Sequence, residues 1–194
     1  MCTGIGIKAK NGSMVYARTM EFGQEMDSNI LMIPRNYAFQ GTAPSGAPGG
    51  LAWKSNYAVV GANALGQVAI IDGVNEKGLA GGLFYFTGYA KYQEVTSHEV
   101  AKSLVPWELM TWILTSFATV QEVRDALPTI KVSNAVFGQW GIVPPVHAIV
   151  HDAQGNVIDS YNSMTKPTSE SIVNAIEKLQ AKNRVSILLL FTKW

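Results

Sequence analysis

The sequence has little of several features that mark special classes of protein. Among its 194 residues there is one cysteine, Cys2, so a scaffold stapled by internal disulfides is excluded. Its 15 Lys and Arg nearly balance 14 Asp and Glu, and the formal net charge of +1 gives no footprint for nucleic acid or an anionic membrane. No apolar run is long enough to span a bilayer, and no signal segment is visible at the start. We therefore expect a soluble cytoplasmic protein without nucleic-acid or membrane partners.

Apolar residues are plentiful instead. Hydrophobic residues make up 47% of the chain and charged residues 15%, which suits one domain with a sizeable core. Short β-rich segments fill the first 100 residues, and Asn11-Gly12 indicates a tight hairpin turn between the first two. Helical signals follow in the apolar run 107–117 and in Thr119-Val120-Gln121-Glu122, which has the spacing of a capping box. Strands, then helices, then strands again predict the α+β class.

The expected elements can be placed by residue range. Beside the hairpin of residues 3–9 and 13–20, strands are predicted at 29–34, 57–60, 67–72, 79–86, 131–134 and 147–152. Residues 41–50, rich in Gly, Pro and Ser, are predicted to form an exposed loop, and Asn75, Glu76 and Lys77 a turn. Near the end we expect a polar stretch at 160–171, an amphipathic helix at 172–182 and an apolar strand at 185–191.

Cys2 is the first candidate for chemistry. A cysteine that follows the initiator Met1 becomes the N-terminal residue when that Met is removed, and it then carries both a thiol and a free α-amine. The amine can take the thiol proton, directly or through water, so that one residue supplies nucleophile and base. Position alone also allows a cysteine without a role, and the surrounding sequence has to decide between the two.

The predicted hairpin gives Cys2 charged neighbours. Partner strands lie about 4.8 Å apart, so the far end of the second strand returns beside Cys2 and brings Arg18 and Glu21 with it. A guanidinium favours a nearby thiolate, and a carboxylate can accept a hydrogen bond from the α-ammonium group. Without Cys2 both would be read as surface charges on a hairpin.

Four ordered segments carry a family resemblance: MCTGI, YARTMEFG, WKSNYAVVGAN and DGVNEKGLAGGLFYFTGYAKY. In order and spacing the chain resembles the choloylglycine hydrolase family of bile salt hydrolases and penicillin V acylases. The resemblance implies an αββα sandwich of the N-terminal nucleophile hydrolase type. It also implies hydrolysis of linear amides through a thioester on the N-terminal cysteine, with a small N-acyl amide as substrate and no cofactor.

The resemblance also assigns catalytic positions. Cys2 matches the nucleophile, Arg18 the arginine beside it, and Glu21 stands where many members have Asp. Tyr85 falls where bile salt hydrolases usually have Asn and penicillin V acylases have Tyr, which leans away from a standard bile salt hydrolase and leaves the substrate open. Its neighbours Phe84 and Phe86 are expected to pack in the core.

Beyond about residue 156 the family pattern stops. We interpret 1–194 as a single hydrolase domain with a family-like part at 2–156 and a divergent tail at 157–194. The Thr-Asn pair that supplies an oxyanion donor in the family does not occur in this sequence. We therefore expect an incomplete sandwich, weak activity and self-association through uncovered strands, as in a homo-oligomer.

Two alternatives to the family activity stay open: a catalytically impaired fragment that is no enzyme, and an acylase for other N-acyl amides such as acyl-homoserine lactones. A metal site is not expected. The three histidines, His98, His147 and His151, are scattered, although the last two share one face of a predicted strand.

Overall fold

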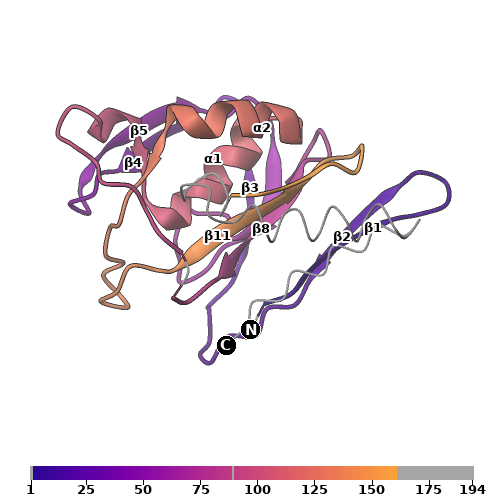
Figure 1. The fold of residues 1–194 in the computed structure, drawn as a ribbon, viewed down its shortest axis with the longest axis horizontal. Helices are drawn as coiled ribbons and strands as arrows, with labels where there is room; N and C mark the ends of the chain where they lie inside the picture. Colours follow the sequence, from indigo (N-terminus) through magenta and orange to yellow (C-terminus); the bar gives the residue numbers. More distant parts are fainter. Residues whose placement is uncertain (1, 89, 161–194) are drawn as a thin grey trace.

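A six-stranded antiparallel sheet forms the centre of the computed structural model, which describes residues 2–88 and 90–160 (Figure 1). Each strand in it pairs antiparallel with its neighbours. In spatial order the strands are β12 (Val157–Asp159), β11 (Val146–His151), β8 (Ala80–Tyr85), β7 (Asp72–Asn75), β6 (Val59–Ala62) and β3 (Ile30–Ile33).

Three two-stranded sheets accompany the central one. The pairs are β1 (Gly4–Lys8) with β2 (Met14–Arg18), β4 (Ala38–Thr42) with β5 (Pro48–Lys54), and, in parallel, β9 (Ser103–Leu104) with β10 (Lys131–Val132). The β1–β2 turn forms as Asn11-Gly12 predicts, because Gly12 adopts φ +89° and the Asn11 carboxamide accepts from the Ser13 amide at 3.0 Å. The first hairpin is thus determined locally.

Two α-helices pack on one face of the central sheet (Figure 1). They are α1 (Leu109–Ser116) and α2 (Val120–Ala126), and short 3₁₀ turns occur at Val100–Lys102, Pro106–Glu108 and Leu127–Thr129. The predicted cap is present, since the Thr119 hydroxyl accepts from the Glu122 amide at 3.2 Å. No helix within 2–88 and 90–160 is long and apolar enough to cross a membrane.

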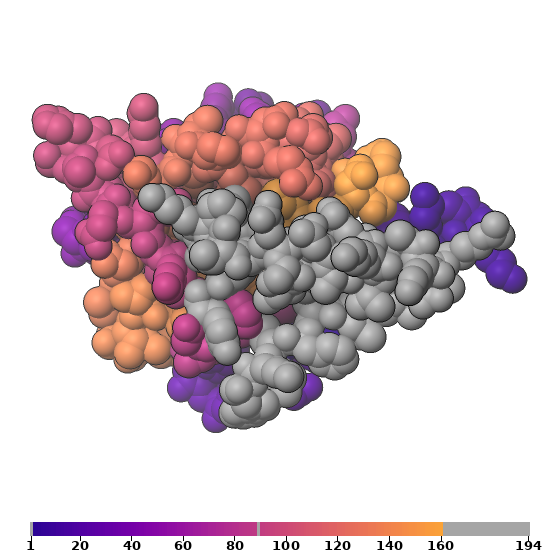
Figure 2. Space-filling model, in the orientation of Figure 1, coloured from indigo at the N-terminus to yellow at the C-terminus, as the bar shows by residue number. Residues whose placement is uncertain are grey.

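The two faces of the central sheet have different partners. On the helix side Leu83, Ala148 and Val150 join α1 in the main apolar core. On the other side the β1–β2 hairpin crosses β8 and β11, and the hairpin tip stands clear of the rest of the described surface (Figure 2). The hairpin comes so close that a Cβ on Gly4 would lie 2.9 Å from the Phe84 ring. The arrangement is one helical layer, one full sheet and the beginning of a second sheet.

The hairpin covers only the β8–β11 end of that face. Met32, Val60 and Val74 pair directly across β3, β6 and β7, and all three are exposed, at 76, 44 and 45%. In the part of the chain that the structure describes, the second sheet is thus shorter than the first. The sandwich is incomplete there, as the sequence predicts.

Three predictions of local structure are wrong. Residues 41–50 are not simply a loop: Gly41 and Thr42 end β4, and 48–50 begin β5. The strand predicted at 67–72 starts where that range ends, as β7, and the one at 57–60 is shifted to β6.

The expected features of residues 161–194 lie outside the described residues. Val157–Asp159, which the sequence analysis includes in the divergent tail, forms the edge strand β12 of the central sheet.

Candidate active site

Cys2 lies at the start of the hairpin, two residues before β1, and its side chain is buried at 4% exposure against Phe84 and Ile149. The backbone just after it is fixed to the second strand. The Thr19 amide donates to the Thr3 carbonyl at 2.9 Å, and the Thr3 amide donates to the Thr19 hydroxyl at 3.1 Å. The start of the hairpin is therefore fixed where Cys2 packs against Phe84 of β8 and Ile149 of β11.

Arg18 ends β2 and faces the same cavity as Cys2. Its guanidinium donates to the Leu83 carbonyl at 2.8 Å and to the Asp72 carboxylate at 3.1 Å. The same group stacks 4.3 Å from the centre of the Phe84 ring. These contacts, with a side chain only 8% exposed, make Arg18 a fixed positive charge at the Cys2 end of the cavity.

Glu21 follows β2 and is exposed, and it is not among the residues that line the cavity. Its predicted role at the α-amine stays a prediction. The carboxylate that the structure does bring to Arg18 is Asp72, the first residue of β7. Burial raises the pKa of Asp72, and the neighbouring Arg18 opposes that rise.

Tyr85 ends β8 and lines the cavity with Cys2 and Arg18. Burial raises the pKa of its phenol, so the group stays protonated near neutral pH and can donate a hydrogen bond. Phe84 packs in the core as predicted and is 1% exposed. Phe86, which was also expected in the core, is only half-buried, and its ring centre lies 5.1 Å from that of His147.

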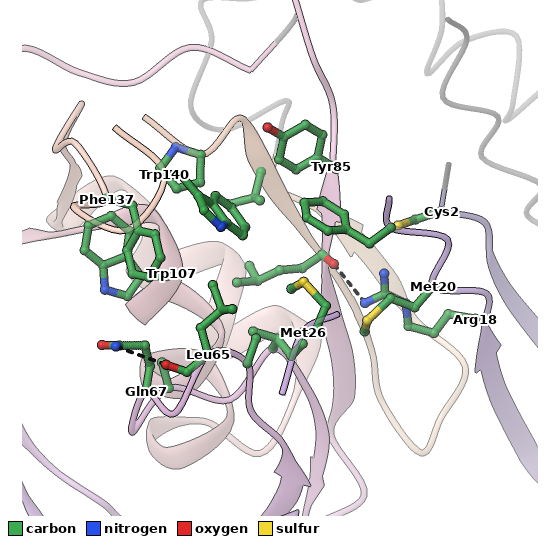
Figure 3. Close-up of a pocket in the computed structure, with 17 residues that line it drawn as sticks. Cys2, Arg18, Met20, Met26, Leu65, Gln67, Tyr85, Trp107, Phe137 and Trp140 are labelled. Atoms are coloured by element: carbon green, nitrogen blue, oxygen red, sulfur yellow. Dashed lines mark hydrogen bonds between the residues drawn. The ribbon is translucent and has the colours of Figure 1, made fainter. Parts of the chain in front are cut away.

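An apolar cavity of about 680 Å³, including its open mouth, extends away from Cys2. Figure 3 shows Cys2 and Arg18 at one end and Trp107, Phe137 and Trp140 at the other. Phe22 connects the ends, because its ring lies 5.4 Å from both Tyr85 and Trp140. Other lining residues include Met20, Met26, Leu65, Ala69, Ile71, Leu83 and Val146.

No group of three or more His, Cys, Asp or Glu within residues 2–88 and 90–160 is arranged to hold a metal ion. His147 and His151 do share a face of β11, but each has its own surroundings: His147 pairs with Asp159 at 2.7 Å, and His151 lies against Tyr16. Asn75 is structural, as predicted, because its buried carboxamide holds the β7–β8 turn and donates to the Leu114 and Phe117 carbonyls.

Comparison with known proteins identifies the family. The model for linear amide C–N hydrolases of the choloylglycine hydrolase family matches residues 2–164. This chain belongs to that family. It is 26% identical over 161 residues to a bile salt hydrolase/transferase of Clostridium perfringens, covering 81% of this chain and 47% of that protein. It is 29% identical over 151 residues to a penicillin V acylase of Pectobacterium atrosepticum, covering 73% and 38%.

Solved structures agree on the fold. A variant of conjugated bile acid hydrolase from Clostridium perfringens superposes with a TM-score of 0.68 at 23% identity, over 92% of this chain and 57% of that one. The predicted fold class, an incomplete sandwich of the N-terminal nucleophile hydrolase type, is thereby confirmed. This choloylglycine hydrolase family chain spans about half the length of the curated relatives it matches.

Several site residues are missed by sequence reasoning. Asp72 appears in the sequence only as the last residue of a predicted strand, and the aromatic end of the cavity comes from segments at 107 and 137–140 that show no motif. One signal was available for Asp72: a carboxylate directly after the apolar run Ala69-Ile70-Ile71 is costly to bury unless it has a partner.

Proposed function

We propose that this chain hydrolyses a linear amide C–N bond with Cys2 as nucleophile after removal of Met1. The thiolate attacks the amide carbonyl carbon, and the α-ammonium group gives its proton to the leaving amine as the C–N bond breaks. Water, losing a proton to the α-amine, then attacks the thioester and releases the carboxylic acid and the thiol. The observation that carries the proposal is that Cys2, Arg18 and Tyr85 line one apolar cavity.

The cavity supports an uncharged, apolar acyl group as the part of the substrate that it holds. Arg18 is the one charged residue among those of the described chain that line it, and it lies at the Cys2 end. An acyl chain or ring can then pack against Phe22, Trp140 and Phe137 while the amide stays near the sulfur. In this proposal the protonated phenol of Tyr85 donates a hydrogen bond to the carbonyl oxygen. These features favour penicillin V and similar N-acyl amides.

A substrate panel tests the proposal: penicillin V, glycine-conjugated bile salts and an N-acyl-homoserine lactone, each incubated with the unaltered protein, Cys2→Ser and Cys2→Ala. We expect release of amine from at least one substrate, a trace in Cys2→Ser and none in Cys2→Ala. When the reaction is stopped in acid during turnover, intact mass should show a fraction of the protein carrying the added mass of the acyl group on Cys2. Equal release by Cys2→Ala would refute the thioester route.

A second candidate, from a different class, is ligand binding without turnover. The apolar lining of the cavity, with a single charged residue among the described residues that form it, suits the binding of an acyl group whether or not the amide is cleaved. Quenching of tryptophan fluorescence by penicillin V, with no amine released at any pH, would support this candidate over hydrolysis.

A further inference from the structure

Arg18 is oriented by one charged contact and two neutral ones. The Leu83 carbonyl and the Phe84 ring fix where the guanidinium can lie, but neither offsets its charge fully. Asp72 does so, at 3.1 Å from the same terminal nitrogen that donates to Leu83. A partly buried charge without a counter-charge is strongly disfavoured, so Arg18 would turn towards solvent if Asp72 lost its charge.

Asp72 is itself held in place. The Tyr16 hydroxyl donates to the carboxylate oxygen that Arg18 contacts, at 3.4 Å. Burial, and then the Asp72 charge, raise the pKa of Tyr16, so this hydroxyl keeps its proton and remains a donor. The side chain of Asp72 is 23% exposed, which leaves its position dependent on these two partners.

The sheet leaves space for this cluster at a single position. Gly82 stands directly across from Asp72 in the β7–β8 pairing. A Cβ added there would lie 2.7 Å from the Asp72 carboxylate, 2.8 Å from the Tyr16 hydroxyl and 3.1 Å from the Arg18 guanidinium. The three polar groups therefore occupy the volume that a side chain at 82 would fill.

We propose that Asp72 is a positioning residue that, with Tyr16, holds the Arg18 guanidinium in the cavity beside Cys2. Asp72 does not line that cavity, so it acts through Arg18 and does not contact the reacting atoms. The inference rests on the proposed amide hydrolysis only for its effect on turnover. Its effect on the cysteine can be measured without any substrate.

The first readout is the ratio of two alkylation rates at Cys2, for anionic iodoacetate and neutral iodoacetamide, followed by intact mass. A positive charge held in the cavity raises this ratio. In Asp72→Asn we expect the ratio to fall about tenfold, towards that of Arg18→Met, because Arg18 leaves the cavity. If Asp72 were only a nearby negative charge, its removal would raise the ratio instead. A ratio that rises or stays constant overturns the proposal.

The second readout is turnover of the substrate that the panel identifies. In Asp72→Asn we expect kcat to fall roughly 10–100-fold with KM within about threefold, as for a misplaced catalytic group. Asp72→Glu should recover part of both readouts, since it restores the charge. The matched control is Glu76→Gln, which neutralises a carboxylate paired with Arg35 just beyond the same strand, and should leave both unchanged.

The two proposals fail separately. If the unaltered protein cleaves nothing but Asp72→Asn lowers the alkylation ratio, the positioning role stands and the amidase proposal fails. If turnover is present and Asp72→Asn, folded by circular dichroism, keeps both the wild-type ratio and the wild-type kcat, the positioning role is wrong and the amidase proposal stands.

Discussion

Acid should destabilise this protein through His151, whose ring is buried beneath the N-terminal hairpin. A Cβ on Gly6 would lie 2.8 Å from that ring, and the Tyr16 ring centre is 5.0 Å from it. Neither ring nitrogen has a hydrogen-bond partner among the described residues. Burial lowers the pKa of His151 from 6.5 to about 4, while the neighbouring Asp152 carboxylate acts in the opposite direction.

The sign and size of the effect follow from these two pKa values. The unfolded chain binds a proton at His151 below pH 6.5, whereas the folded chain resists it until about pH 4. The contribution of His151 to the free energy of unfolding is present above pH 6.5 and is lost as the pH falls towards 4. Between pH 7 and pH 4.5 this single group should lower the free energy of unfolding by about 2 kcal/mol.

Urea unfolding at pH 7 and pH 4.5 measures this loss in the unaltered protein and in His151→Phe, which keeps an aromatic ring but cannot titrate. Other groups titrate equally in both proteins, so the difference between them isolates His151. His98→Gln, at an exposed histidine, is the control and should keep the full pH dependence. If His151→Phe loses as much stability in acid as the unaltered protein, the imidazole is not the group responsible.

Three further predictions concern processing and packing. Intact mass of the soluble protein should lack Met1, and retention of that residue would remove the free amine that the mechanism needs. Thr119→Ala removes the hydroxyl that caps α2 and should lower the free energy of unfolding by about 0.5–2 kcal/mol, whereas an unchanged urea midpoint would mean that the cap contributes nothing. Ile113→Ala, at a fully buried position of α1, should cost about 2–5 kcal/mol in the same assay, and a loss below 1 kcal/mol would show that the core closes around the gap.

Local signals in the sequence predict local structure well. The Asn11-Gly12 turn and the cap at Thr119 each depend on residues within four positions of one another, and both are present. The stretch 41–50 misleads because two of its glycines, Gly41 and Gly50, serve close packing. A Cβ on Gly50 would lie 2.5 Å from the Thr42 carbonyl, and Glu108, far along the chain, accepts from the Thr42 amide. Composition indicates a loop, but tertiary contacts make a strand pair.

In the site, too, the sequence predicts what depends on neighbouring residues and misses what depends on tertiary packing. The hairpin predicts that Arg18 returns towards Cys2, because both lie on one short two-stranded unit, and both do line the cavity. Tyr85 was placed by family resemblance. Asp72 could not be assigned from spacing, since its link to Arg18 depends on the hairpin crossing the central sheet at Gly82. The aromatic end of the cavity likewise depends on how distant segments pack.

The N-terminal hairpin links the stability of the fold to the positions of Cys2 and Arg18. Gly4 rests on Phe84 and Gly6 on His151, so the strand that begins just after Cys2 is seated on the central sheet at two successive points of one face. The opposite strand carries Tyr16 and Arg18, which reach the sheet at Asp72. We expect a proton on His151 to be accommodated by lifting this hairpin, which would move Cys2 and Arg18 together. Any amidase activity should therefore be lost through this group as the pH approaches 4, where the folded chain takes up the proton, and His151→Phe should move that loss to lower pH.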